Sequence, residues 1–128
     1  KAEIKEKMLN TFFDSIIMAG EKTTVQDFLD DLLTPTEKVM LAKRLMASYF
    51  IEKGVSYRRI SDILKLSPTT INSIQKILLR EGGGYRAIFN LISRSSKLED
   101  FLEKFIRLTE PAIPPMQGSK GSYMRRKK

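Results

Sequence analysis

Residues 55–80 read VSYRRISDILKLSPTTINSIQKILLR and contain two helix starts about eleven residues apart. Ser56 can cap the first helix, and Ser67 followed by Pro68 is typical of the start of the second, because serine caps helices well and proline suits the first helical position. Apolar side chains recur on both segments with the helical period. They are Ile60, Ile63, Leu64, Leu66, Ile71, Ile74 and Leu78. The stretch therefore predicts two short helices that are joined by a tight turn and packed through these apolar faces.

The second of these helices has a polar face near its N-terminus that carries no acidic side chain. Its members are Thr69, Thr70, Asn72, Ser73 and Lys76. Such a face can enter the major groove of DNA, which is roughly 12 Å wide, without repelling phosphates, and its hydroxyl and amide groups can read base edges. We therefore expect these five residues to read bases from a helix-turn-helix. The alternative is an ordinary helical hairpin whose polar residues only solvate it, but the spacing, the Ser-Pro-Thr-Thr start and the local charge favour DNA.

A second set of polar residues is expected to contact the DNA backbone. Tyr57, Arg58 and Arg59 stand at the start of the first helix of the motif, where they can grip phosphates. Contacts of this kind fix the position of a protein on the duplex without reading its sequence. The predicted backbone contacts are Ser56, Tyr57, Arg58, Arg59, Ser67 and Arg80.

Positive charge is concentrated in the middle and last parts of the 128-residue chain, whose formal net charge is +8. Residues 1–54 carry 8 Lys/Arg against 9 Asp/Glu, whereas residues 55–96 carry 7 against 2 and residues 97–128 carry 8 against 4. A localised basic balance is typical of a surface that binds a polyanion, whereas a generally basic surface is not diagnostic. The distribution therefore favours nucleic acid as a partner.

The remaining segments also carry the helical period, and none shows the sustained alternation of a β-strand, so we expect an all-α protein. Thr34, Pro35 and Glu37 have the spacing of a capping box and open a helix that runs to about Lys53. Apolar side chains cover nearly its whole circumference, and such a helix must be surrounded by protein. We therefore expect a homodimer in which a second copy completes the core, with the central helix of a monomeric bundle as the alternative.

The pattern divides the chain into three parts. Residues 1–95 are expected to form a dimerisation and helix-turn-helix domain, with the motif at 55–80. An additional helix over 96–109 follows, because Ser96-Lys97-Leu98-Glu99 repeats the capping-box spacing. Residues 110–128 contain three prolines and the run Arg125-Arg126-Lys127-Lys128, which is typical of a disordered basic tail.

Several kinds of chemistry are excluded by the residues that the chain lacks. It contains no Cys, His or Trp, which rules out disulfides, thiolate or histidine metal sites, and Cys-His or Ser-His catalysis. The adjacent acidic pairs Asp30-Asp31 and Glu99-Asp100 face different directions on a helix and do not converge on a site. We therefore expect that the protein is not an enzyme and that it has no catalytic residue, no metal site and no cofactor.

The sequence also bears on location in the cell. No apolar run approaches the roughly 20 residues that span a membrane. Residues 1–9 lack the basic-then-apolar layout of a signal peptide. We therefore expect a cytoplasmic, nucleoid-associated protein with no membrane partner.

Several blocks between Phe12 and Phe89 form a specific combination. They are FFDSI at 12–16, FLDDLLTPTE at 28–37, LAKRL at 41–45, SYRRI at 56–60 and SPTTI at 67–71. Together they resemble the Trp repressor family, in particular its YerC/YecD branch. The resemblance implies an intertwined, all-helical homodimer with a helix-turn-helix that binds double-stranded DNA. One departure is Lys65, which stands in the turn where many such motifs have glycine and is strained if its φ angle is positive.

The same resemblance bears on a small-molecule effector. In family members that need tryptophan, an arginine of the third helix and the threonine of Thr-Pro help to hold the ligand, and Arg44 and Thr34 match these positions. Where such members have an arginine and a glycine on the recognition helix, this chain has Ser73 and Ile74. The second positively charged contact to the ligand is therefore absent, and Ile74 fills the space that the tryptophan ring would occupy. Both departures argue against tryptophan as the effector. The identity of any effector stays open.

Two functions are compatible with these features. The first is a sequence-specific transcriptional regulator, expected to be a repressor, which binds a palindromic operator as a dimer and inserts residues 68–80 into successive major grooves. The alternative is a nonspecific nucleic-acid-binding or protein-interaction module that uses the basic tail or the helix at 97–108. If removal of residues 111–128 abolishes all binding and no sequence preference is found, the alternative is correct.

Overall fold

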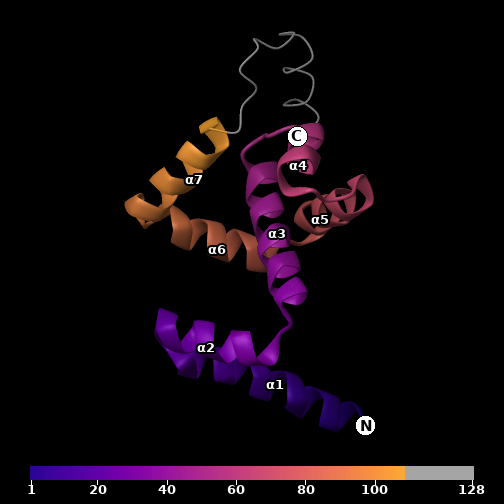
Figure 1. Cartoon of the computed structure of the whole chain (residues 1–128). Coiled ribbons are helices and arrows are strands. Elements are labelled where there is room, and N and C mark those ends of the chain that lie inside the picture. Colours follow the sequence, from indigo (N-terminus) through magenta and orange to yellow (C-terminus); the bar gives the residue numbers. More distant parts are fainter. Residues whose placement is uncertain (109–128) are drawn as a thin grey trace. The chain divides into compact units, whose positions relative to one another are not determined.

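The computed structural model describes residues 1–108, where it contains seven α-helices and no β-strand. The all-α class predicted from the sequence is therefore confirmed. The predicted basic tail, residues 110–128, and residue 109 of the predicted additional helix lie outside the described residues. The helices are α1 (Ala2–Ala19), α2 (Lys22–Leu32), α3 (Pro35–Glu52), α4 (Tyr57–Leu64), α5 (Pro68–Arg80), α6 (Gly83–Ser93) and α7 (Ser96–Leu108) (Figure 1).

The internal contacts divide the chain into two compact units, Lys1–Leu41 and Ala42–Lys128, which we call the N-terminal unit and the C-terminal unit. The N-terminal unit contains α1, α2 and the start of α3. The C-terminal unit contains the rest of α3 and α4 to α7. Because α3 is one continuous helix, its residues 35–41 and 42–52 belong to different units.

The helices of the N-terminal unit pack against each other without enclosing a core. None of residues 1–41 is buried, and large apolar side chains such as Met8, Ile17 and Met18 are 66%, 76% and 80% exposed. A groove of about 530 Å³ lies between α1 and α2, and Phe12 and Phe28 are among its mostly apolar lining residues. The amphipathic pattern of these helices thus has no internal partner within the unit.

The loop between α2 and α3 is fixed by local polar contacts. The backbone N–H of Thr34 donates to Glu37 Oε1 at 2.8 Å, and the backbone N–H of Glu37 donates to Thr34 Oγ1 at 3.1 Å. The capping box predicted at this position is therefore confirmed. An ion pair between Lys38 and Asp30 ties the first turn of α3 to α2.

The C-terminal unit has a closed hydrophobic core built around the second half of α3. Residues 47–51 are five consecutive buried positions, so this part of α3 is surrounded on every side. The apolar circumference predicted for the helix is present here, but the chain's own helices cover it. The other buried apolar residues are Val55, Ile60, Leu64, Leu66, Ile71, Ile74, Leu78, Ile92 and Leu102.

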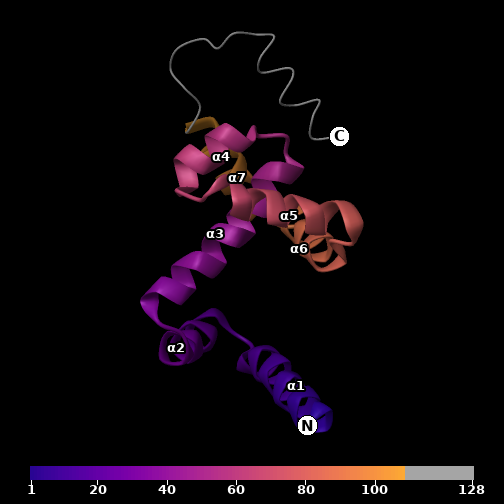
Figure 2. The same cartoon turned by 90° about the vertical axis from the view of Figure 1, so that its right-hand side faces the viewer.

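Aromatic contacts bring α6 and α7 onto α3. The rings of Tyr49 and Phe89 meet edge to face at 5.8 Å between centroids, and those of Phe50 and Phe105 lie 5.7 Å apart. Figure 1 shows α6 leading away from α5 and α7 returning toward α3, and in the turned view of Figure 2 α7 lies behind α4. The start of α7 differs from the predicted one, because the hydroxyl of Ser95, not Ser96, accepts from the backbone N–H of Leu98 at 3.3 Å.

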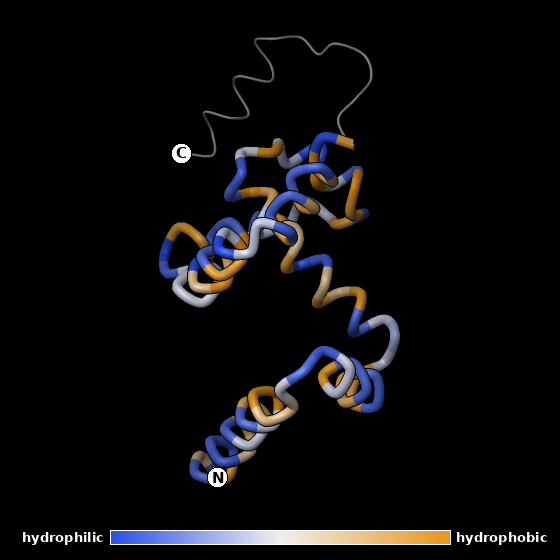
Figure 3. The backbone as a smooth tube through the Cα atoms, turned by 90° about the vertical axis from the view of Figure 1, so that its left-hand side faces the viewer, coloured by the Kyte–Doolittle hydropathy of each residue, from blue (hydrophilic) through white to orange (hydrophobic). Residues whose placement is uncertain are grey.

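Hydrophobic residues occur along the helices of both units (Figure 3). Figure 3 shows them along α1 and α2 as well as along the helices of the C-terminal unit. The difference between the units therefore lies in burial and not in composition. No helix within residues 1–108 is long and apolar enough to cross a membrane.

Candidate nucleic-acid interface

Both helices of the predicted motif begin where the sequence places their caps. The hydroxyl of Ser56 accepts a hydrogen bond from the backbone N–H of Arg59 at 3.2 Å. Ser67 Oγ accepts from the backbone N–H of Thr70 at 3.2 Å, and Pro68 occupies the first helical position of α5. Because each cap satisfies a backbone donor of its first turn, the two helix starts are fixed by contacts within three residues along the chain.

A tight turn joins α4 to α5. Lys65 ends α4 in the left-handed conformation with φ 57° and ψ 49°, so the strain expected for a side chain at this position is present. Ser61 Oγ donates to the carbonyl oxygen of Leu66 at 2.8 Å, and Leu66 is buried. These contacts close the turn, and the role of Ser61 was not evident from the sequence.

The inner face of the motif matches the apolar pattern with one addition. Ile60, Ile71 and Ile74 are fully buried, whereas Ile63 is only partly buried. The addition is Gln75, which is 8% exposed and whose Oε1 has no hydrogen-bond partner among the described residues. A polar residue on this face gave no signal in the apolar periodicity, so sequence reasoning missed it.

The outer face of α5 is accessible at the positions predicted to read bases. Thr69, Asn72, Ser73 and Lys76 are exposed and Thr70 is half-buried. Among the described residues, the side chains of Asn72 and Lys76 make no hydrogen bond, which leaves an amide and an ammonium group available for a ligand. The face therefore presents donors and acceptors and carries no carboxylate.

Two hydroxyl groups of the same face are partly engaged. Ser67 Oγ donates to Thr70 Oγ1 at 3.0 Å, and Ser73 Oγ donates to the carbonyl oxygen of Thr69 at 3.1 Å. The Thr70 hydroxyl thus accepts one hydrogen bond and keeps its proton for another acceptor. Ser73 keeps only acceptor capacity while this bond is made.

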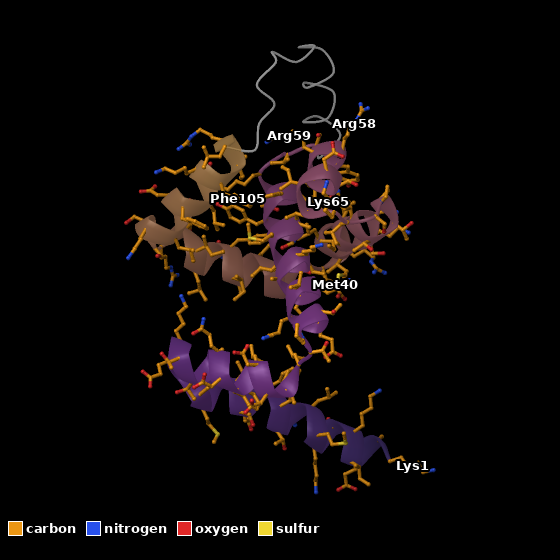
Figure 4. The ribbon with its side chains drawn as sticks, in the orientation of Figure 1. Lys1, Met40, Arg58, Arg59, Lys65 and Phe105 are labelled. Atoms are coloured by element: carbon orange, nitrogen blue, oxygen red, sulfur yellow. The ribbon has the colours of Figure 1, made fainter. Side chains whose placement is uncertain are left out.

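The residues predicted to contact the backbone differ in exposure. Arg58, Ser67 and Arg80 are exposed, whereas Tyr57 is half-buried and Ser56 is buried. Tyr57 packs against the core of the C-terminal unit. These residues lie at the ends of α4 and α5, and Arg58 lies at the N-terminal end of α4 in Figure 4.

Arg59 has a contact that local sequence reasoning did not find. Its side chain is half-buried, and Nη2 donates to the carbonyl oxygen of Ile106 in α7 at 3.1 Å. The two residues are 47 positions apart in the chain. Neighbouring arginines therefore have different environments, because Arg58 is exposed and Arg59 is held by α7.

The positions expected to bear on an effector lie in both units. Thr34 is exposed in the N-terminal unit and takes part in the capping box. Arg44 is half-buried in the C-terminal unit, and Ile74 is fully buried in its core. Within residues 1–108, no group of three or more acidic side chains is arranged to hold a metal ion.

The chain matches the model of a known protein family. The family model described as Trp repressor protein matches residues 7–93, which include α4, α5 and both of their caps. The chain belongs to the Trp repressor family. Members of this family are DNA-binding helix-turn-helix regulators and not enzymes. No curated protein matches the chain, and no solved structure does. Helix α7 lies wholly beyond the part that the Trp repressor family model matches.

Proposed function

We propose that this member of the Trp repressor family is a sequence-specific transcriptional repressor that binds a palindromic operator as a homodimer. Each subunit inserts α5 into the major groove, and the two copies of α5 reach successive grooves about 34 to 36 Å apart. Thr69, Thr70, Asn72, Ser73 and Lys76 read bases. The observation that carries this proposal is the acid-free outer face of α5, whose opposite face is fixed in the core.

Arg58 is the leading candidate for a phosphate contact. It is exposed on the first turn of α4, and Ser67 and Arg80 are exposed at the two ends of α5. Ser56 and Tyr57 are less accessible, so any contact from them is expected through the backbone or the tyrosine hydroxyl. We assign Arg59 chiefly to α7, because its guanidinium already donates to Ile106.

The homodimer is supported by the apolar surface of the N-terminal unit. Ile4, Met8, Phe13, Ile17 and Met18 are each more than half exposed in a single chain. Monomeric proteins rarely leave a large contiguous apolar patch in water. A second copy would cover these residues, so we propose that residues 1–95 act as the dimerisation and helix-turn-helix domain.

Tryptophan is not proposed as the effector. Ile74 is fully buried in the core. The resemblance implies that tryptophan-dependent members of the family have glycine at this position. Ser73 provides no positive charge at the neighbouring position. The YerC/YecD branch, which the resemblance of the sequence blocks indicates, stays part of the proposal.

The proposal is tested by selecting bound sites from randomised duplexes with the full chain. We expect a two-fold symmetric consensus. Lys76→Ala should weaken binding to that site by about 10-fold to 100-fold, because a base contact contributes about 1 to 3 kcal/mol, and should change binding to random DNA little. Arg58→Ala should weaken both by similar factors, because a phosphate contact carries no sequence information.

A matched control is Lys104→Ala, which removes an exposed lysine from α7. It should leave the preference for the selected site unchanged. Equal losses on selected and random DNA for Lys76→Ala would contradict base reading by α5. Absence of any consensus would favour the nonspecific nucleic-acid-binding alternative.

A further inference from the structure

Helix α7 lies outside residues 7–93, the part that the Trp repressor family model matches, and is nevertheless integrated into the core. Leu102 is 5% exposed, and the ring of Phe105 packs on that of Phe50 at 5.7 Å between centroids. Figure 4 shows Phe105 between α7 and α3. This packing gives α7 a fixed place in the C-terminal unit.

Polar contacts fix α7 to the end of α3 and engage its last acidic side chain, Glu103. Glu103 Oε2 lies 3.3 Å from Lys53 Nζ and accepts a hydrogen bond from the hydroxyl of Tyr49 at 3.4 Å. Burial by itself would lower the pKa of Lys53, but the hydrogen bond and the negative charge of Glu103 raise it above its ordinary value. Lys53 therefore stays charged at neutral pH, and Glu103 stays paired with it.

The last turn of α7 is held at the start of α4. Arg59 Nη2 donates to the carbonyl oxygen of Ile106 at 3.1 Å, and Arg59 lies on the first turn of α4 next to Arg58, our candidate phosphate contact. Figure 4 shows Arg59 between α7 and α4. Arg107 follows Ile106 directly in the chain, so its backbone lies beside the first turn of α4.

Arg107 is exposed, and its guanidinium makes no hydrogen bond and no ion pair within residues 1–108. A glutamate four residues earlier on the same helix is a common partner for an arginine. Glu103 holds that position, but its carboxylate is engaged by Lys53 and Tyr49. An exposed cation that its own chain does not neutralise is available to a polyanion.

This end of α7 forms a basic surface together with the start of α4. Residues 57–60 and 104–108, which the Arg59 hydrogen bond joins, contain four Lys/Arg and no Asp/Glu. Figures 1 and 2 show α4 and the last turn of α7 at the same end of the C-terminal unit. Phosphates follow one another about every 3.4 Å of helix axis on each strand of DNA, so arginines held this closely can contact neighbouring phosphates.

We propose that Arg107 is a further DNA-phosphate contact, which α7 adds beside Arg58, and that Arg59 is the positioning residue that holds it there. This inference rests on the DNA-binding function proposed above and assigns a part in it to α7. A phosphate contact carries no sequence information. Arg107 therefore raises the affinity for every duplex and leaves the preference for the operator unchanged.

The experiment compares Arg107→Ala with the unmodified full chain on the selected operator and on a random duplex, by fluorescence anisotropy at several salt concentrations. A phosphate contact contributes about 0.9 to the slope of log K against log salt, so the slope should become shallower by about 0.9 for each subunit on both duplexes. Between about 50 and 200 mM salt, the unmodified chain should lose about 3.5-fold more affinity per subunit than the variant. An unchanged slope overturns the proposal.

Two controls separate a phosphate contact from other effects of the substitution. Arg107→Lys keeps the charge, so its slope should match that of the unmodified chain, and a slope as shallow as that of Arg107→Ala overturns the contact. Lys97→Ala removes an exposed charge at the other end of α7, about 15 Å away along the helix, and should leave the slope unchanged. Equal changes for Lys97→Ala and Arg107→Ala would show an effect of net charge and overturn the proposal.

The positioning role of Arg59 is tested by a double-mutant cycle on the random duplex. Arg59→Met removes the donor that holds Ile106, so Arg107→Ala should lower the affinity less in this background than in the unmodified chain. Phe105→Ala removes the ring contact to Phe50 without changing a charge, and the loss from Arg107→Ala should shrink in this background too. A variant that was only less stable would give additive losses, so full-size losses in both backgrounds overturn the positioning role.

These outcomes separate the two proposals. A symmetric consensus together with an unchanged salt slope for Arg107→Ala would leave the regulator function standing and overturn this inference. A shallower slope without any sequence preference would support the Arg107 contact and contradict base reading by α5. A full chain that binds no DNA would overturn both.

Discussion

The two units carry apolar helices of similar kind but bury them differently. In the N-terminal unit none of residues 1–41 is buried, whereas residues 47–51 of the C-terminal unit are all buried by helices of the same chain. Helix α3 shows the contrast within one element, because Val39 and Leu41 are 51% and 55% exposed and Phe50 is fully buried. Apolar periodicity therefore predicts which face needs a cover, and it does not predict which chain supplies the cover.

The largest expected effect is in the closed core. Phe50→Ala should lower the free energy of unfolding by about 3 to 5 kcal/mol, because it removes a fully buried ring and leaves a cavity. Met18→Ala removes a side chain that is 80% exposed in the single chain, so at protein concentrations where the chain is monomeric it should cost less than about 0.5 kcal/mol. Urea unfolding of both variants measures the difference. Equal costs would mean that the N-terminal unit is as closed as the C-terminal unit.

The next effect concerns the open unit. Ile17→Glu places a charge on a side chain that is 76% exposed in one chain and that we propose to be covered by a second copy. The dissociation constant of the dimer should rise at least about 100-fold, because an unpaired charge is costly to bury. Sedimentation at several concentrations measures it. Asn10→Glu on the same helix is the control, and equal dissociation constants for both variants would exclude Ile17 from the interface.

Local signals in the sequence predicted much of the C-terminal unit. The caps at Ser56 and Ser67 were placed correctly, because a capping hydroxyl acts within three residues of its own position. The apolar face of the motif was also predicted, apart from the partial exposure of Ile63. The cap of α7 was misplaced by one residue, because Ser95 and Ser96 are adjacent and both suit the position.

Contacts between distant segments could not be predicted in the same way. The hydrogen bond from Arg59 to Ile106 depends on how α7 packs, and the periodicity of neither segment contains that information. The burial of Gln75 is a second case, because a glutamine between apolar positions is equally compatible with either face. The same limit applies to α3, because its apolar circumference does not reveal that helices of its own chain cover its second half.

Two glycines with positive φ angles, one in each unit, allow a smaller test of the difference in packing between the two units. An added Cβ at Gly82, in the C-terminal unit with φ 63°, would lie 3.0 Å from Leu78 Cα. At Gly20, in the N-terminal unit with φ 74°, the nearest atom would be Met18 O at 3.6 Å. Both substitutions cost about 1 to 2 kcal/mol for the positive φ angle, which is paired with ψ 15° at Gly82 and ψ −37° at Gly20. Only Gly82→Ala adds a backbone clash. Gly82→Ala should therefore lower stability by about 1 kcal/mol more than Gly20→Ala.

The comparison is made by urea unfolding of both alanine variants in the full chain. Gly84→Ala serves as a control, because its Cβ would meet no atom within 4 Å and alanine is the better helix former. This variant should be neutral or more stable by up to about 1 kcal/mol. If Gly20→Ala costs as much as Gly82→Ala, a second copy crowds Gly20 and the N-terminal unit is more closed in solution than in one chain.

The smallest effect concerns the turn that closes the helix-turn-helix. Lys65 is the only non-glycine residue within 1–108 that has a positive φ angle, at 57°, and its ψ of 49° places it in the left-handed helical region. Lys65→Gly should relieve about 1 kcal/mol of strain and lose part of it to the greater freedom of glycine in the unfolded chain. We expect a net gain of about 0.5 kcal/mol, seen as a higher urea midpoint with an unchanged slope.

Lys104→Gly is the matched control, because it makes the same change inside α7, where glycine should cost about 1 kcal/mol. Opposite signs for the two variants would show that the backbone of Lys65, and not the loss of a lysine, determines the result. A loss of stability in Lys65→Gly would instead mean that its side chain makes a stabilising contact in the folded protein. In that case the left-handed conformation of Lys65 would not lower the stability of the C-terminal unit.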